Sequence, residues 1–92
     1  MRQKGILQRK IITVLVDGYS THNFIDATLV EKINLPTKSF EGLIVVISRN
    51  NTMVCDWWNP NLQVNLGDFT MKDNFYVVSA TDTNMVFGVK CL

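Results

Sequence analysis

Charged residues, cysteines and long apolar runs are all scarce in this chain, and each shortage argues against a class of protein. Only 18% of the 92 residues are charged and 47% are apolar, which argues against disorder. A net charge of +1 gives no reason to expect nucleic-acid binding. The two cysteines, Cys55 and Cys91, show neither metal-ligand nor disulfide spacing, so we expect reduced thiols, no metal and no cofactor.

The sequence also shows no signal-peptide pattern and no pattern of a membrane span, so we expect neither. The residues after Met1 are polar, and Asp17 interrupts the next apolar stretch, so no run is long enough to cross a membrane. We therefore expect an intracellular, cytoplasmic protein without a membrane partner. The length corresponds to one domain covering residues 1–92. For so short a chain the apolar share is high, which suggests that a second copy covers part of the surface.

Strand patterns dominate what is present. Apolar and alternating stretches predict strands at residues 6–7, 11–16, 42–47, 52–55, 62–66, 69–78 and 85–87. The stretch 11–16 is nearly continuous in apolar residues, as in a strand buried on both faces. Four of the nine basic residues fall within the first ten positions, which favours a solvated hairpin over a basic arm.

One segment predicts a helix, Asp26–Ile33. Asp26 is placed to cap its N-terminus, and Leu35-Pro36 ends it because proline disfavours helical backbone in the residue before it. Short strands around a single helix predict an all-β fold, a small closed β domain with one short helix.

The most informative segment is residues 12–25, ITVLVDGYSTHNFI. A β-branched strand delivers one carboxylate, Asp17, into a tight turn of small and hydroxyl residues. That turn consists of Gly18, Tyr19, Ser20 and Thr21. His22 is the only histidine, but Ser20 is too close in sequence to form a nucleophile–histidine pair with it, so we expect a structural role for His22.

Residues 12–25 resemble the active-site loop of the retropepsin-like aspartic proteases of plant gypsy-type LTR retrotransposons, in which an Asp-Gly-Gly or Asp-Ser-Gly turn leads to Thr-His-Asn-Phe-Ile. The resemblance continues along the chain. Residues 26–36 are similar to the family's short helix and leucine-proline, residues 73–78 to its DFYVL strand, and residues 84–92 to its D-V-V-L-G-V-x-W-L motif.

This resemblance implies the acid protease fold, a closed β-barrel that carries half an active site per chain. It implies an aspartic endopeptidase from a gag-pol polyprotein, working as a homodimer on peptide or polyprotein substrates. Asp17 would be the catalytic residue, one from each subunit. Two adjacent carboxylates share a proton, so one activates a water while the other polarises the peptide carbonyl.

The resemblance also implies two accessory segments. The flap that closes over a bound peptide would be the hairpin of residues 42–58, which includes Ser48 and has its tip at Arg49, Asn50 and Asn51. The residues that pass beside the active-site loop would be Val86, Phe87 and Gly88.

Several positions depart from the family pattern. Tyr19 stands where the family has glycine, and would cost about 1–2 kcal/mol if the turn requires positive φ. Asn84 replaces an aspartate and Cys91 a tryptophan. The sequence stops at Leu92, before the helix and strand with which retroviral proteases dimerise, so we expect that element to be missing or to belong to a longer polyprotein. Two alternatives therefore stay open: a catalytically decayed pseudo-protease that binds peptide or protein or has no function, and an unrelated β-barrel binding module.

Overall fold

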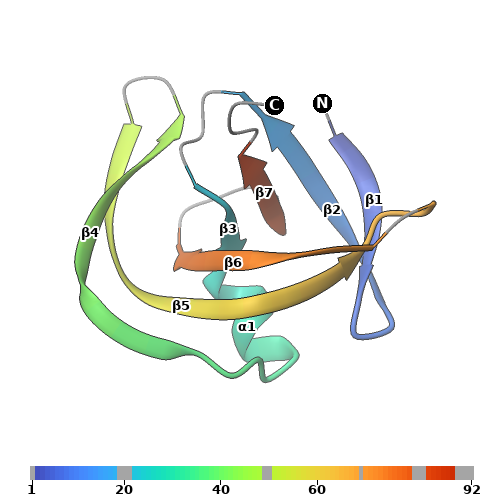
Figure 1. The fold of residues 1–92 in the computed structure, drawn as a ribbon, viewed down its shortest axis with the longest axis horizontal. Coiled ribbons are helices and arrows are strands. Elements are labelled where there is room, and N and C mark those ends of the chain that lie inside the picture. The colour runs from blue at the N-terminus through green and yellow to red at the C-terminus, as the bar shows by residue number, and fades with distance from the viewer. Residues whose placement is uncertain (1, 19–21, 49–50, 69, 80–82, 89–92) are drawn as a thin grey trace.

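The computed structural model describes residues 2–18, 22–48, 51–68, 70–79 and 83–88, and of residues 43, 45–48 and 51–53 it describes the backbone alone. The described residues form seven strands and one short helix, which confirms the predicted mainly-β class (Figure 1). The elements are β1 (Arg2–Leu7), β2 (Lys10–Asp17), β3 (Phe24–Asp26), α1 (Ala27–Lys32), β4 (Lys38–Ser48), β5 (Asn51–Asn65), β6 (Thr70–Val78) and β7 (Met85–Gly88). Within these ranges no helix has the length and apolar character needed to cross a membrane.

All seven strands belong to one sheet, in the order β1-β2-β7-β3-β6-β5-β4. The pairs β2–β7 and β3–β6 are parallel, whereas the other pairs are antiparallel. β7 therefore lies between β2 and β3, next to two strands from the first third of the chain (Figure 1). One further pair, Ile6 with Asn65, brings β1 beside β5.

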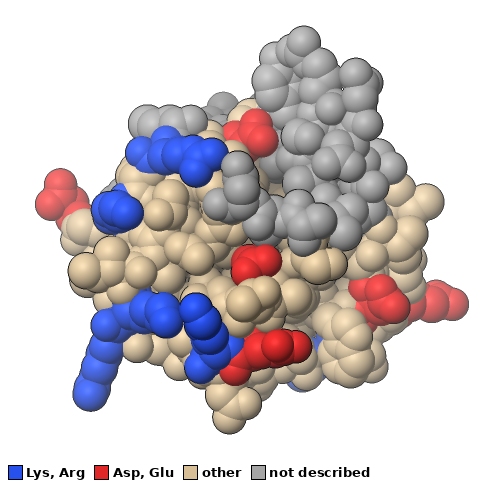
Figure 2. All heavy atoms as spheres, turned by 180° about the vertical axis from the view of Figure 1, so that it is seen from behind, with Lys and Arg blue, Asp and Glu red and all other residues tan. Residues whose placement is uncertain are grey.

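The β1–β2 hairpin matches the sequence prediction. Gln8 and Arg9 form its turn with φ of 49° and 67°, as in the two-residue turns whose twist suits a hairpin. The early basic residues lie on this hairpin and are exposed: Arg2, Lys4, Arg9 and Lys10. Figure 2 shows basic and acidic side chains interspersed on the face behind that of Figure 1, with no continuous basic surface.

The prediction that β2 is buried on both faces is wrong for its first half. Ile11 is 70% exposed, whereas Ile12 and Val14 are each 2% exposed. The cause is the alternation of side chains along a strand, since only one face of this hairpin packs on the core.

β4 and β5 form a long curved hairpin on one side of the molecule (Figure 1). The sequence predicted separate strands at 52–55 and 62–66, but β5 is continuous from Asn51 to Asn65. Its pairing with β6 shifts register between Asn59 and Leu62, and Asn61 there has a φ of 55°. This irregularity lets the strand continue through Pro60, which has no N–H to donate.

α1 packs beneath the sheet through Leu29, which is 3% exposed. Asp26 occupies the N-cap position but makes no capping hydrogen bond, so that prediction is wrong. Asp26 is instead the last residue of β3, and its N–H donates to the Asn84 carbonyl at 2.9 Å. The helix gives way at Asn34, with a φ of 55°, just before Leu35-Pro36.

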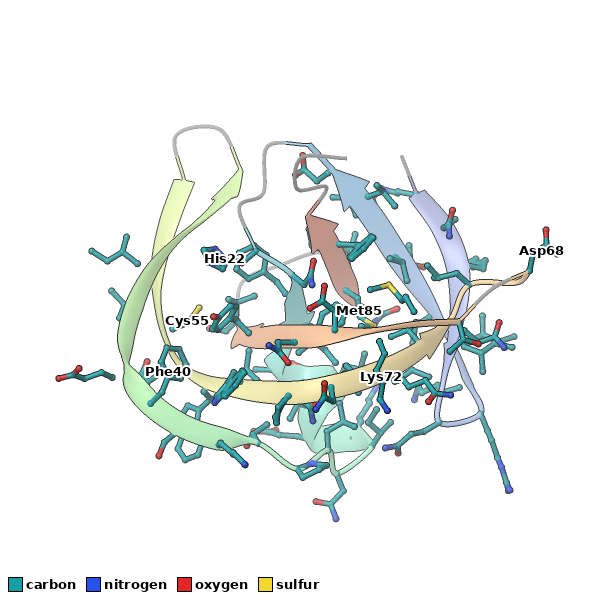
Figure 3. All side chains as sticks on the ribbon, viewed as in Figure 1. His22, Phe40, Cys55, Asp68, Lys72 and Met85 are labelled. Atoms are coloured by element: carbon teal, nitrogen blue, oxygen red, sulfur yellow. The ribbon has the colours of Figure 1, made fainter. Side chains whose placement is uncertain are left out.

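The core has two parts. The larger lies between the sheet and α1, and its buried members are Leu7, Ile12, Val14, Ile25, Leu29, Leu35, Leu62, Val64, Leu66, Phe75 and Met85. The smaller comprises Phe24, Cys55, Val78 and Val86. Figure 3 shows Met85 near the middle of the molecule and Cys55 on the side of the β4–β5 hairpin. The smaller cluster therefore holds that hairpin against the strands that carry the candidate site.

Candidate functional site

Asp17 is the last residue of β2 and is partly buried. Its partner in the parallel β2–β7 ladder is Gly88, and the preceding pairs join Leu15 to Val86 and Val16 to Phe87. The structure therefore brings residue 17 and residues 86–88 together from opposite ends of the chain. Val86 and Gly88 are buried and Phe87 is partly buried, so the backbone next to the carboxylate is shielded from solvent.

The turn after Asp17 is described only at its first residue. Gly18 is exposed, and a Cβ placed there would meet no other heavy atom within 4 Å. The structure thus shows no steric need for glycine at this position. The other expected members of the turn, Tyr19, Ser20 and Thr21, lie outside the described residues.

The expected flap is the far end of the β4–β5 hairpin. Ser48 and Asn51 form the last pair of its ladder, and Arg49 and Asn50 lie outside the described residues. In Figure 1 this end of the hairpin and the end of β2 that carries Asp17 both point to the top of the view, whereas α1 lies at the bottom.

Asn23 is a structural residue that the sequence interpretation missed. Its side chain is 1% exposed and bridges two strands: Nδ2 donates to the Asn74 carbonyl at 3.1 Å, and Oδ1 accepts from the Gly88 N–H at 3.0 Å. Its own carbonyl accepts from the Tyr76 N–H at 2.9 Å. Asn23 therefore fixes the residue that pairs with Asp17. The sequence feature that could have indicated this role is the position of Asn23, an amide residue directly before the apolar pair Phe24-Ile25.

Asn84 holds the other end of β7. Its Oδ1 accepts from the Thr13 N–H at 2.9 Å, and its carbonyl accepts from the Asp26 N–H at 2.9 Å. The side-chain contact uses only an acceptor oxygen, which asparagine and aspartate both provide. This explains how asparagine serves where the resembled family has aspartate.

His22 belongs to a row of aromatic contacts. Its ring meets Tyr76 edge to face, with centroids 5.1 Å apart. Tyr76 in turn stacks on Trp58 at 6.4 Å and contacts Phe40 at 5.5 Å. These contacts join the segment before β3 to the β4–β5 hairpin (Figure 3). The structural role expected for His22 stays a prediction.

The described cysteine offers no reactive thiolate. Cys55 is 2% exposed, and burial, followed by the negative charge of Asp56, raises the pKa of its thiol above the usual 9.0. It is a free thiol, as expected, and Cys91 lies outside the described residues. Among the residues with described placement, no three His, Cys, Asp or Glu side chains form a group that could hold a metal ion.

Comparisons with protein families, with curated proteins and with solved structures returned no match. The function is therefore inferred from the chain's own residues and their placement.

Proposed function

We propose that this chain is a retropepsin-like aspartic endopeptidase domain from a retrotransposon polyprotein, acting inside the cell on peptide or polyprotein substrates. The observation that carries the proposal is the position of Asp17 at the end of β2, paired with Gly88 of β7. The β4–β5 hairpin ends on the same side of the molecule, where a flap would close over a bound peptide (Figure 1).

The sheet topology supports the closed barrel that this fold requires. The pair between Ile6 and Asn65 joins β1 to β5, so the six strands β1-β2-β7-β3-β6-β5 form a continuous ring of neighbours. The approach of these strands is close. A Cβ on Gly5 would lie 3.2 Å from the Asn65 carbonyl oxygen and 3.1 Å from Leu66 Cδ2.

Catalysis in this proposal needs two copies of the chain. Each contributes one Asp17, and the two carboxyl groups share one proton because two adjacent charges repel. The ionised oxygen takes a proton from a water, which attacks the peptide carbonyl, while the protonated partner donates a hydrogen bond to the carbonyl oxygen. Cleavage therefore requires one protonated and one ionised carboxyl group in the pair.

The direct test is cleavage of an extended peptide library in mildly acidic solution by the wild-type chain and by Asp17→Asn. We expect cleavage by the wild type, inhibition by a statine-type inhibitor and no cleavage by the variant. Asp68→Asn is the matched control because Asp68 is exposed and lies in the turn between β5 and β6, outside the candidate site. Full activity in Asp17→Asn would disprove the proposal. Sedimentation equilibrium at chain concentrations from micromolar to millimolar should show the dimer.

A second candidate is a catalytically decayed pseudo-protease that keeps the fold and binds peptide or protein, or has lost function. The observation that favours it is Tyr19, a large side chain where the resembled family has glycine. The variant Tyr19→Gly separates the two candidates. Activity that appears only in the variant identifies the natural chain as the decayed form, whereas activity in both supports the protease.

A further inference from the structure

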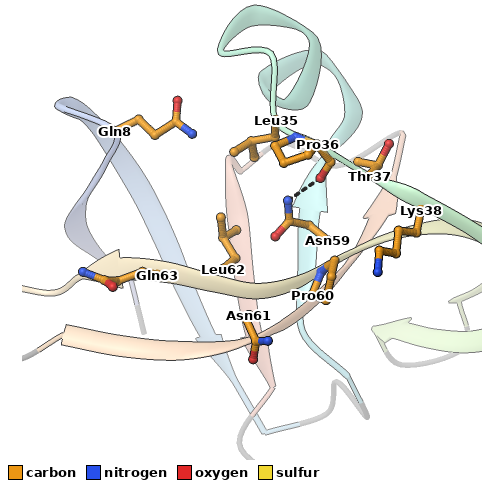
Figure 4. Close-up of a pocket in the computed structure, with 10 residues that line it drawn as sticks. All are labelled: Gln8, Leu35, Pro36, Thr37, Lys38, Asn59, Pro60, Asn61, Leu62 and Gln63. Atoms are coloured by element: carbon orange, nitrogen blue, oxygen red, sulfur yellow. Dashed lines mark hydrogen bonds between the residues drawn. The ribbon is translucent and has the colours of Figure 1, made fainter.

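The structure has a pocket that lies away from Asp17. It is a pocket of about 400 Å³ between the segment that follows α1 and the irregular middle of β5 (Figure 4). Leu35 and Leu62, which are 7% and 6% exposed, provide its apolar floor. None of its lining residues belongs to the candidate active site, and it lies toward the α1 end of the molecule, opposite to the end that carries Asp17.

Asn59 gives this pocket an unused hydrogen-bond acceptor. Its side chain is 4% exposed, and its Nδ2 donates to the Pro36 carbonyl (Figure 4). No described residue donates to Oδ1, which Figure 4 shows pointing away from Pro36 toward Leu62. Since no described side-chain polar atom is both fully buried and unpaired, this oxygen retains some solvent contact, and Asn59 is one of the residues that line the pocket. An acceptor oxygen without a protein partner, on a side chain that is nearly buried, favours a ligand that donates an N–H.

The residues that line the pocket carry positive charge only. Lys38 is the only charged residue of the pocket, and it is exposed and forms no ion pair among the described residues. The other polar lining groups are uncharged, and Gln8, Asn61 and Gln63 are the exposed amides among them. No carboxylate is among the lining residues, and the nearest one in the sheet is Asp73, which pairs with Leu62 across the β5–β6 ladder. The attraction for an anionic group therefore comes from Lys38.

We propose that this pocket binds a short acidic peptide segment. An apolar side chain packs on Leu35 and Leu62, a backbone N–H donates to Asn59 Oδ1, and the carboxylate of an acidic residue approaches Lys38 Nζ. The volume is at the small end of ligand pockets, which suits two or three residues. The absence of aromatic lining residues and the single cation disfavour a nucleotide, which uses base stacking and several phosphate contacts. This proposal is independent of protease activity.

The experiment is an NMR titration of the full chain with acetyl-leucyl-glutamyl amide. The matched probe is acetyl-leucyl-glutaminyl amide, which removes only the charge, and a third probe has N-methylated backbone nitrogens, which removes the donor to Asn59 without changing the protein. Lys38→Gln tests the cation. Lys4→Gln is its control, because it changes net charge equally on an exposed site outside this pocket.

We expect saturable shifts at residues 36–38 and 59–63. Affinity should fall about fivefold for the glutaminyl and N-methyl probes and for Lys38→Gln, and stay unchanged for Lys4→Gln. Lys38→Gln should not weaken the glutaminyl probe further, since the two changes remove the same contact. Three outcomes would overturn the proposal: no saturable shift, equal binding of the charged and uncharged probes, or shifts centred on residues 17–18 and 86–88. Sodium acetate producing the same shifts with equal affinity would instead identify a bare carboxylate site, which also overturns the peptide assignment.

Discussion

Replacing Asn23 by alanine should lower the free energy of unfolding more than replacing any other described asparagine by alanine. The side chain makes two hydrogen bonds, to the Asn74 carbonyl and from the Gly88 N–H, and both would be lost. Gly88 is buried, so its N–H would have no water to replace the lost acceptor. The hydrogen bond to the Asn74 carbonyl is only partly buried, so its loss carries a smaller cost.

The magnitude follows from these two groups. An orphaned buried N–H costs about 1–3 kcal/mol, and the loss of an ordinary hydrogen bond costs about 0.5–1.5 kcal/mol. We therefore expect Asn23→Ala to lower the free energy of unfolding by about 2–4 kcal/mol, a large share of the roughly 5–14 kcal/mol typical of a chain of this length.

Urea unfolding followed by the fluorescence of Trp57 and Trp58 measures this change, with the chain concentration held fixed because a dimer would couple to folding. For a slope of about 1–1.5 kcal/mol/M, the midpoint should fall by about 1.3–4 M. Asn74→Ala is the matched control, since its Oδ1 makes only an exposed hydrogen bond, with the Asn61 N–H at 3.0 Å. If Asn23→Ala costs no more than this control, the two buried bonds do not hold β7 in place.

Three further changes test other parts of the structure. Gly5→Ala should lower the unfolding free energy by about 1–3 kcal/mol in the same urea assay, because its Cβ would lie 3.1 Å from Leu66 Cδ2 and 3.2 Å from Val14 Cγ2. Its control, Gly18→Ala, should be nearly neutral, because a Cβ at Gly18 would meet nothing within 4 Å. Equal effects of the two changes would contradict the close approach of β1 and β5. Arg9→Gly should raise the midpoint by relieving about 1 kcal/mol of strain at a φ of 67°, and a lower midpoint would argue against this turn. Cys55, in a Cys91→Ser background, should react with iodoacetamide slowly in the native chain and rapidly in urea. Because burial raises the pKa of Cys55, its contribution to stability is complete below the usual 9.0 and declines as pH rises above it; fast native alkylation or no decline would refute this.

The sequence predicted the strands where each strand had a clear apolar pattern bounded by turn residues. The β1–β2 hairpin is the best example, because apolar arms flank the polar Gln8-Arg9 turn. β3 was missed because three residues are too few to show a period, and Phe24-Ile25 gains its partners from β6 and β7 far along the chain. The unbroken length of β5 was missed because Pro60 resembles a strand end, and only the register shift beside it shows how the strand continues.

The residue types of the candidate site could be predicted from the sequence, but the strand pairing and hydrogen bonds that hold these residues in place could not. An aspartate after a β-branched strand is visible in the sequence, as is a glycine at the end of the last strand. Their pairing depends on the parallel register of β2 and β7, which no local pattern encodes. The same holds for Asn23, whose type is common in turns and whose role comes only from burial between Asn74 and Gly88.

The position of Asp17 depends on a very short strand. β7 has four residues, and its parallel ladder with β2 ends at the pair that contains Asp17. The backbone hydrogen bonds of so short a ladder hold the strand weakly, but amide side chains hold both of its ends. Asn84, the residue just before β7, accepts a hydrogen bond from the Thr13 N–H of β2. Asn23 accepts a hydrogen bond from the N–H of Gly88, the last residue of β7. Because both amides act on β7 and neither belongs to the turn, the turn residues can differ from those of a typical protease without displacing the strand beside the carboxylate. Loss of Asn23 or Asn84 should therefore act on where Asp17 lies.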